Sequence, residues 1–196
     1  MGGKWNRWKN PVSEVVDGVK VQRKEYTQWA GMINRVKSDK HYDGVSVSDN
    51  FKNYDWYLDW AKQQKGFLNL EPCGRLWAID KDIVGDGTIY SEDICVFVPA
   101  EINNMFKASG STLPIGVSTT KSRRSDYSVS AKYLGVRFAL GTYNSLLKAH
   151  NVYLTFRKCI VDDLYRDYGD HIDNRVWEQL YKSCYLEYYN TDIYDL

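Results

Sequence analysis

The sequence predicts an α+β protein built from two domains in series. Short runs of apolar and β-branched residues, typical of strands, alternate with stretches in which apolar residues recur at helical spacing. After Phe106 the chain changes to the small, polar segment KASGSTLP, a composition typical of linkers. We therefore expect a first domain over residues 1–108 and a second over residues 109–196.

The composition allows packed cores but indicates no membrane segment. The chain has 196 residues, of which 43% are hydrophobic and 15% aromatic, enough for one large or two small domains. No run of 18 apolar residues occurs, and the basic, aromatic start MGGKWNRWKN does not resemble a secretory signal. We expect a cytoplasmic protein without an organic cofactor. The four cysteines form no Cys-x-x-Cys pair, which argues against a zinc finger.

The first domain is expected to open with an irregular segment over residues 1–20, followed by two helices. In residues 24–37, apolar residues including Trp29 and Met32 recur at helical spacing. Ser48, Asp49 and Asn50 then offer N-cap residues for a second helix that ends near residue 66. One stripe of this helix is apolar and consists of Phe51, Tyr54, Leu58 and Ala61.

The end of the first domain is predicted to be strand, loop, strand and helix. The strand over residues 76–79 leads into Asp80 and Asp82, and a glycine-containing loop leads to a second strand over residues 95–98. Pro99 ends that strand, and a short helix over residues 100–106 carries Asn103. Carboxylate and amide oxygens are ligands that Mg²⁺ accepts. The sequence therefore predicts one Mg²⁺ or Mn²⁺ ion held by Asp80 and Asn103, with Asp82 as a further ligand.

This segment resembles a divergent HNH (ββα-metal) nuclease motif, in the form carried by freestanding homing-endonuclease-like proteins of T7-like bacteriophages. The usual core is His-x-Asp, a loop, Asn-Leu-x-x-Val-Thr and a helix ending in His or Asn. Residues 80–82 (DKD), residues 94–99 (ICVFVP) and Asn103 stand in those places. The segment NFKNYDWYLDWA extends the resemblance over about residues 24–106. The histidine base and the middle asparagine of the motif are both replaced.

Two alignments of the motif remain open. In the first, Asp80 takes the place of the histidine, so a carboxylate must act as the general base. In the second, Asp80 replaces an acidic metal ligand and Lys81 falls on the base position, which requires a strongly lowered lysine pKa. The resemblance implies a metal-dependent DNA endonuclease in the cytoplasm of a phage-infected bacterium, with Asp80, Lys81, Asp82 and Asn103 as catalytic residues. The alternative is a degenerate HNH fold in a non-catalytic DNA-binding protein that acts as a regulator or interference factor.

The second domain is predicted to be a three-stranded antiparallel sheet packed on a long helix. A strand over residues 114–118 is followed by a basic loop and by two alternating strands, over residues 127–133 and 136–140. The alternation places apolar side chains on one face of the sheet and polar side chains on the other. A helix then begins after Thr142 and keeps one face apolar to residue 160, and a C-terminal helix completes the domain.

Charge is distributed unevenly along the chain, although the net charge is only +1. Residues 117–158 contain eight basic residues and one acid, whereas residues 159–196 contain three basic residues and nine acids. A basic module of this kind attracts nucleic acid, and an acidic tail repels it. The basic module is therefore the part of the chain expected to contact DNA.

The phrases GVS (116–118) and LGTYNSLLKAHNVY (140–153) resemble the AP2 DNA-binding domain, with its GVR and LGTF-x-T-x-x-x-A-x-x-A-Y pattern. In that family the exposed face of the sheet lies in the major groove. The resemblance covers about residues 114–158 and implies double-stranded DNA as the partner. A module that binds a host protein through the aromatic first domain remains a third possibility. The residues expected to contact DNA are Lys121, Arg123, Arg124, Ser128, Ser130, Lys132 and Arg137.

Overall fold

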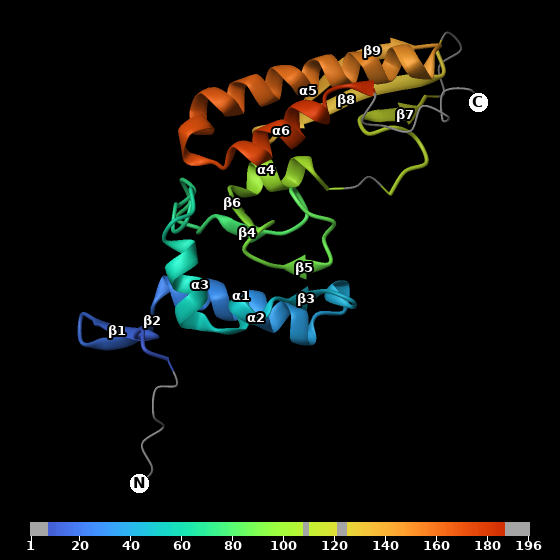
Figure 1. Ribbon diagram of the computed structural model, residues 1–196. Coiled ribbons are helices and arrows are strands. Elements are labelled where there is room, and N and C mark those ends of the chain that lie inside the picture. The colour runs from blue at the N-terminus through green and yellow to red at the C-terminus, as the bar shows by residue number, and fades with distance from the viewer. Residues whose placement is uncertain (1–7, 108–109, 121–124, 187–196) are drawn as a thin grey trace. The chain divides into compact units, whose positions relative to one another are not determined.

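The computed structural model describes residues 8–107, 110–120 and 125–186 (Figure 1). It is a mixed α+β protein with several small sheets, so the predicted class is confirmed. The chain forms two compact units. The first contains Met1–Asn104 with His171–Asp173, and the second contains Met105–Asp170 with Asn174–Leu196.

The first unit contains an N-terminal hairpin in a part of the sequence expected to be irregular. Strands β1 (Ser13–Val16) and β2 (Val19–Gln22) pair antiparallel. They are joined by Asp17 and Gly18, whose φ angles are 51° and 78°. Positive φ at both central positions is the hallmark of the type I′ hairpin turn, for which Asp-Gly is a favoured sequence. The expectation of an irregular segment over residues 1–20 is therefore wrong from residue 13 onward.

The helices of the first unit follow the predicted apolar pattern with one interruption. Helix α1 (Lys24–Ser38) forms as expected. The predicted second helix is instead two helices, α2 (Asp49–Lys52) and α3 (Tyr54–Ala61). The side chain of Asn53 accepts hydrogen bonds from the backbone N–H groups of Asp55 and Trp56. Asn53 thus caps α3 and breaks the helix, although the predicted apolar stripe is buried throughout.

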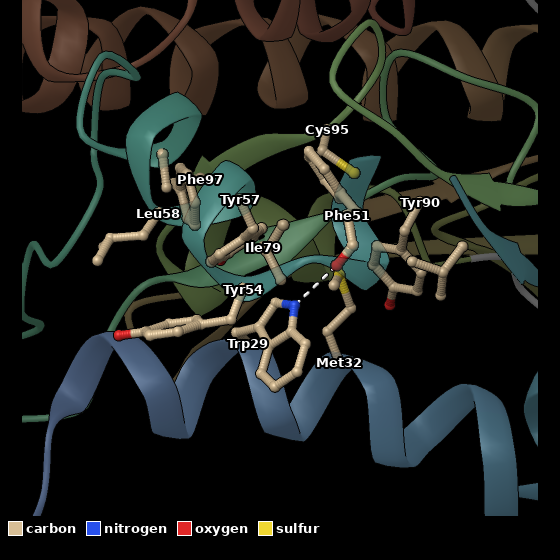
Figure 2. Close-up of a cluster of buried hydrophobic side chains, with 12 residues drawn as sticks. Trp29, Met32, Phe51, Tyr54, Tyr57, Leu58, Ile79, Tyr90, Cys95 and Phe97 are labelled. Atoms are coloured by element: carbon tan, nitrogen blue, oxygen red, sulfur yellow. Dashed lines mark hydrogen bonds between the residues drawn. The ribbon is translucent and has the colours of Figure 1, made fainter. Parts of the chain in front are cut away.

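An aromatic core holds these helices against the strands that follow (Figure 2). The Trp29 indole Nε1 donates a 2.7 Å hydrogen bond to the carbonyl oxygen of Phe51. The Phe51 ring lies 5.2 Å from the Tyr57 ring in an edge-to-face arrangement, a geometry that aromatic pairs prefer. Ile79 and Phe97 are buried in the same cluster. The core therefore anchors the strand that ends at Asp80.

Two small sheets and a helix complete the first unit. Strand β3 (Ser46–Val47) pairs parallel with β5 (Ile89–Tyr90). Strand β4 (Ala78–Asp80) pairs antiparallel with β6 (Val96–Val98), and α4 (Ala100–Met105) follows. The predicted order of strand, loop, strand and helix is thus present. The specific HNH fold remains a prediction.

The second unit contains the predicted three-stranded sheet and long helix. The sheet has the order β7 (Val117–Thr119), β8 (Tyr127–Tyr133) and β9 (Val136–Tyr143), and both pairs of strands are antiparallel. Helix α5 (Leu146–Tyr168) lies along this sheet (Figure 1). A short 3₁₀ turn at Gly169–His171 precedes α6 (Asn174–Lys182). The core of the unit consists of Val117, Val129, Ala131, Ala149, Tyr153 and Leu154.

No helix in the described ranges is both long enough and apolar enough to cross a membrane.

Candidate functional site

The carboxylate of Asp80 shapes the loop that follows β4. Asp80 is the last residue of β4 and pairs with Val96 of β6. Its side chain is buried, and its Oδ1 accepts hydrogen bonds from the backbone N–H groups of Asp82 (2.8 Å) and Ile83 (2.9 Å). Burial raises the pKa of Asp80 above its ordinary value, against the opposing effect of these two N–H groups. The side chain therefore has a structural role in this turn.

Lys81 is folded against an aromatic wall. Its Nζ donates a 2.6 Å hydrogen bond to Oδ1 of Asp82 and lies 5.5 Å from the ring centroids of both Tyr42 and Tyr90. Only 6% of the lysine side chain is exposed, compared with 59% of its Asp82 partner. A cation over two ring faces is stabilised by the negative potential of those faces. These two tyrosines were not predicted, because they lie in segments distant from Lys81 in the sequence.

The donor groups after β4 do not fit a divalent cation in this arrangement. A hard cation such as Mg²⁺ requires about six oxygen ligands. Oδ1 of Asp80 already accepts two N–H groups, and Oδ1 of Asp82 is bonded to an ammonium whose charge repels a cation. In the described part of the chain, no group of three or more His, Cys, Asp or Glu side chains could hold a metal ion. The Mg²⁺ site therefore remains a prediction without support from these contacts.

Asn103, the fourth predicted site residue of the first domain, lies in α4. It is partly buried, and its backbone N–H donates to the Pro99 carbonyl in the first turn of the helix. Among the described residues, no hydrogen bond joins its side chain to Asp80. A metal site shared by Asp80 and Asn103 therefore stays a prediction.

The polar face of the β7–β8–β9 sheet brings two predicted DNA-contact residues together. Lys132 of β8 lies directly opposite Arg137 of β9 in the strand register, and both side chains are exposed. Directly opposite residues on one face of an antiparallel pair have neighbouring side chains. The two positive charges are therefore adjacent. No acidic residue occurs in the three described strands.

Serine hydroxyls occupy the same face further along the sheet. Ser128 lies opposite Ser118 of β7, and their hydroxyl oxygens are 2.9 Å apart. Ser130 is partly exposed between Ser128 and Lys132. The predicted contact residues Lys121, Arg123 and Arg124 lie outside the described residues. Four of the seven predicted DNA-contact residues are thus on one face, which we name the polar face: Ser128, Ser130, Lys132 and Arg137.

The opposite face of the sheet is used for packing. Val129 and Ala131 are buried against α5, and the Tyr133 hydroxyl donates to Asp163 of that helix. Phe138 contacts the ring of Phe156, also in α5, at a centroid distance of 5.2 Å. The predicted placement of apolar side chains on one face of these strands and polar side chains on the other is therefore confirmed. The polar face is the side that points away from α5.

Comparison with known proteins adds no assignment, since no protein-family model, curated protein or solved structure matches this chain.

Proposed function

We propose that this protein binds double-stranded DNA through the polar face of the β7–β8–β9 sheet. The observation that carries the proposal is the exposed pair formed by Lys132 and Arg137. The two residues lie directly opposite each other on strands that contain no acidic residue. Most protein–DNA hydrogen bonds go to phosphates and sugars, and the donors include arginine, lysine and serine side chains. The polar face presents all three.

Side-chain chemistry also distinguishes the two members of this pair. Arg137 carries a planar guanidinium that can donate two parallel hydrogen bonds to a phosphate or to a guanine edge. Lys132 offers a flexible point charge suited to a single phosphate oxygen. We expect Arg137 to contribute to any sequence preference and Lys132 to contribute mainly to general affinity.

The salt dependence of binding tests this proposal. Removing one side chain that binds a phosphate should reduce the slope of log K against log salt by about 0.9. The double variant Lys132→Ala/Arg137→Ala should therefore show weaker binding to a short duplex and a slope lower by about 2. Lys158→Ala is the matched control, because this lysine lies on α5 and is paired with Asp162. Absence of DNA binding by the wild type, or an unchanged slope in the double variant, would contradict the proposal.

The order of β4, β6 and α4 favours a second candidate, the metal-dependent endonuclease implied by the HNH resemblance. We place it second because the contacts of Asp80 and Asp82 do not fit a bound cation. Incubation of supercoiled plasmid with the protein and Mg²⁺ or Mn²⁺ tests it. Nicking that disappears in Asp80→Asn and Asn103→Ala would support the endonuclease. DNA binding without nicking in the presence of either metal would contradict the endonuclease and leave DNA binding as the function.

A further inference from the structure

Two hairpins in this chain use the same turn geometry with different residues. In β1–β2 the turn is Asp17-Gly18, with φ angles of 51° and 78°. In β8–β9 the turn is Leu134-Gly135, with φ angles of 49° and 80°. Both turns have two residues between directly paired strand ends. The chain thus provides its own comparison of aspartate and leucine at one backbone conformation.

Leucine is poorly suited to this position for two independent reasons. The left-handed region costs a non-glycine residue about 1–2 kcal/mol, and aspartate and asparagine tolerate it better than leucine does. The Leu134 side chain is also 71% exposed, so it gains almost nothing from packing inside the protein. Neither the turn nor the core of the unit explains a leucine here. Residues held in strained backbone conformations without a packing role cluster at sites of ligand contact.

We infer that Leu134 is an apolar contact residue that reaches the bases of duplex DNA from the tip of the β8–β9 hairpin. This inference rests on the proposed DNA-binding function and specifies how the hairpin tip takes part in it. The strand pair nearest the tip is Tyr133–Val136, and the next is Lys132–Arg137. When the two basic residues bind phosphates, the tip is within reach of a groove. Apolar side chains in a groove contact thymine methyl groups or enter a base step.

The cations next to the tip distinguish DNA from an apolar partner. Lys132 and Arg137 are one strand pair away from Tyr133 and Val136, which flank the turn. Val136 is 56% exposed but pairs with Tyr133, so it lies on the face opposite to the two cations. The hairpin tip therefore combines the exposed Leu134 with two adjacent cations. This combination matches a DNA groove, in which apolar base surface lies between rows of phosphates. It is the reason that we assign the contact to DNA rather than to an apolar protein surface.

The variant Leu134→Asn separates the two consequences of this inference. Asparagine suits the left-handed conformation, so the midpoint of thermal unfolding should rise by about 2–4 °C. Removal of the apolar side chain from the groove should weaken binding to a short mixed-sequence duplex about 10-fold. Because every phosphate-binding residue is kept, the slope of log K against log salt should stay unchanged. Leu134→Met, which keeps an apolar side chain, should retain most of the affinity.

The reciprocal control is Asp17→Leu, which places leucine in the other turn. It should lower the unfolding midpoint by a similar amount and leave DNA affinity unchanged. If the wild type binds DNA and Leu134→Asn binds it equally tightly, this inference is overturned while the proposed function stays in place. A reduced salt slope in Leu134→Asn would also overturn it, because the weaker binding would then be electrostatic in origin. Failure of the wild type to bind any duplex would overturn both.

Discussion

In the second unit, the backbone of Gly116 lies directly against the ring of Tyr153. A Cβ atom added at Gly116 would overlap Cδ2 of that ring, and the φ angle of 79° is itself unfavourable for other residues. Gly116 comes just before β7, and Tyr153 is buried in the core beneath the sheet. The close approach therefore sets how tightly the start of β7 packs on α5.

We predict that Gly116→Ala destabilises the second unit by about 2–4 kcal/mol, because overpacking and backbone strain add. Gly135→Ala is the matched control. Its φ angle is 80°, but no atom lies within 4 Å of the added Cβ, so only the strain of about 1 kcal/mol applies. Urea unfolding followed by circular dichroism measures both. Equal destabilisation of the two variants would show that the Tyr153 ring moves aside without cost.

Asp80 yields a prediction that separates a structural role from a catalytic one. Asp80→Ala leaves the N–H groups of Asp82 and Ile83 without their acceptor and should cost about 1–3 kcal/mol. Asp80→Asn keeps an acceptor oxygen at Oδ1 and should fold at least as well as the wild type. If Asp80 were a metal ligand or a base, Asp80→Asn would instead remove activity while leaving stability intact. Denaturant unfolding and the plasmid assay together distinguish these outcomes.

The pH dependence of Asp80 gives a further test of its structural role. Burial raises its folded-state pKa above the ordinary value of 3.8, so the stability that this group contributes is present below that pH and is lost as pH rises through the folded-state pKa. Asp80→Asn carries no charge to bury. The variant should therefore gain stability relative to the wild type on going from about pH 3 to pH 7. A constant difference across this range would show that burial of the Asp80 charge has no energetic consequence.

Local sequence signals predicted the second unit better than the first. The alternation in β8 and β9 was enough to place Lys132 and Arg137 on one face, because side chains in a strand alternate strictly. The β1–β2 hairpin was missed although Asp17-Gly18 between valine runs is a strong hairpin signal. The break at Asn53 was missed because the apolar stripe continues across it. Its signal was an asparagine followed by Asp55, which is typical of an N-cap.

The surroundings of Lys81 could not be predicted from local sequence. Its ammonium lies against Tyr42 and Tyr90, which the 3₁₀ turn Lys40–Tyr42 and strand β5 bring together. The parallel pairing of β3 with β5 involves two residues in each strand and joins segments more than 40 positions apart. Such short, non-local pairings leave no periodic pattern in the sequence. The proposed metal ligands Asp80 and Asn103 were matched by motif position, and no local signal showed that the Asp80 carboxylate would be bonded to the loop backbone.

Arg157 of α5 is a buried cation whose partners are neutral. Only 4% of the residue is exposed. Its Nε donates to the Ser183 hydroxyl at 3.0 Å, and its Nη2 donates to the Met105 carbonyl at 2.9 Å. Met105 is the first residue of the second unit, and its carbonyl lies in the segment that leads to β7. The guanidinium thus joins three segments of the second unit.

We predict that Arg157→Ala destabilises the second unit by about 2–4 kcal/mol, since the carbonyl and the hydroxyl lose a buried donor. Arg157→Lys should recover little of the lost stability, because one ammonium cannot reproduce the two directed N–H donors of the guanidinium. The neighbouring Lys158→Ala should leave unfolding almost unchanged, because that side chain is on the surface. Thermal and urea unfolding measure all three variants. A small effect of Arg157→Ala would show that water replaces the guanidinium.

His150 should make the second unit sensitive to mild acid. The side chain is buried in α5, where its ring lies 6.3 Å from that of Tyr153 in a stacked arrangement, and burial lowers its pKa from 6.5 to about 4. Between these two values the unfolded chain binds a proton that the folded protein does not bind, so the free energy of unfolding falls as pH falls from 6.5 to 4. The destabilisation attributable to this group is at most about 3 kcal/mol at pH 4.

The variant His150→Phe isolates this effect, because phenylalanine keeps a ring in the core but cannot take up a proton. Relative to the wild type, it should gain stability steadily between pH 6.5 and pH 4 and show a constant difference above pH 7. His171→Gln is the control for the loss of a histidine outside the core, since this histidine is exposed. Urea unfolding at a series of pH values measures the difference. Parallel profiles for wild type and His150→Phe would mean that the buried imidazole accepts its proton without unfolding, so that water or a neighbouring group stabilises the charged form inside the unit.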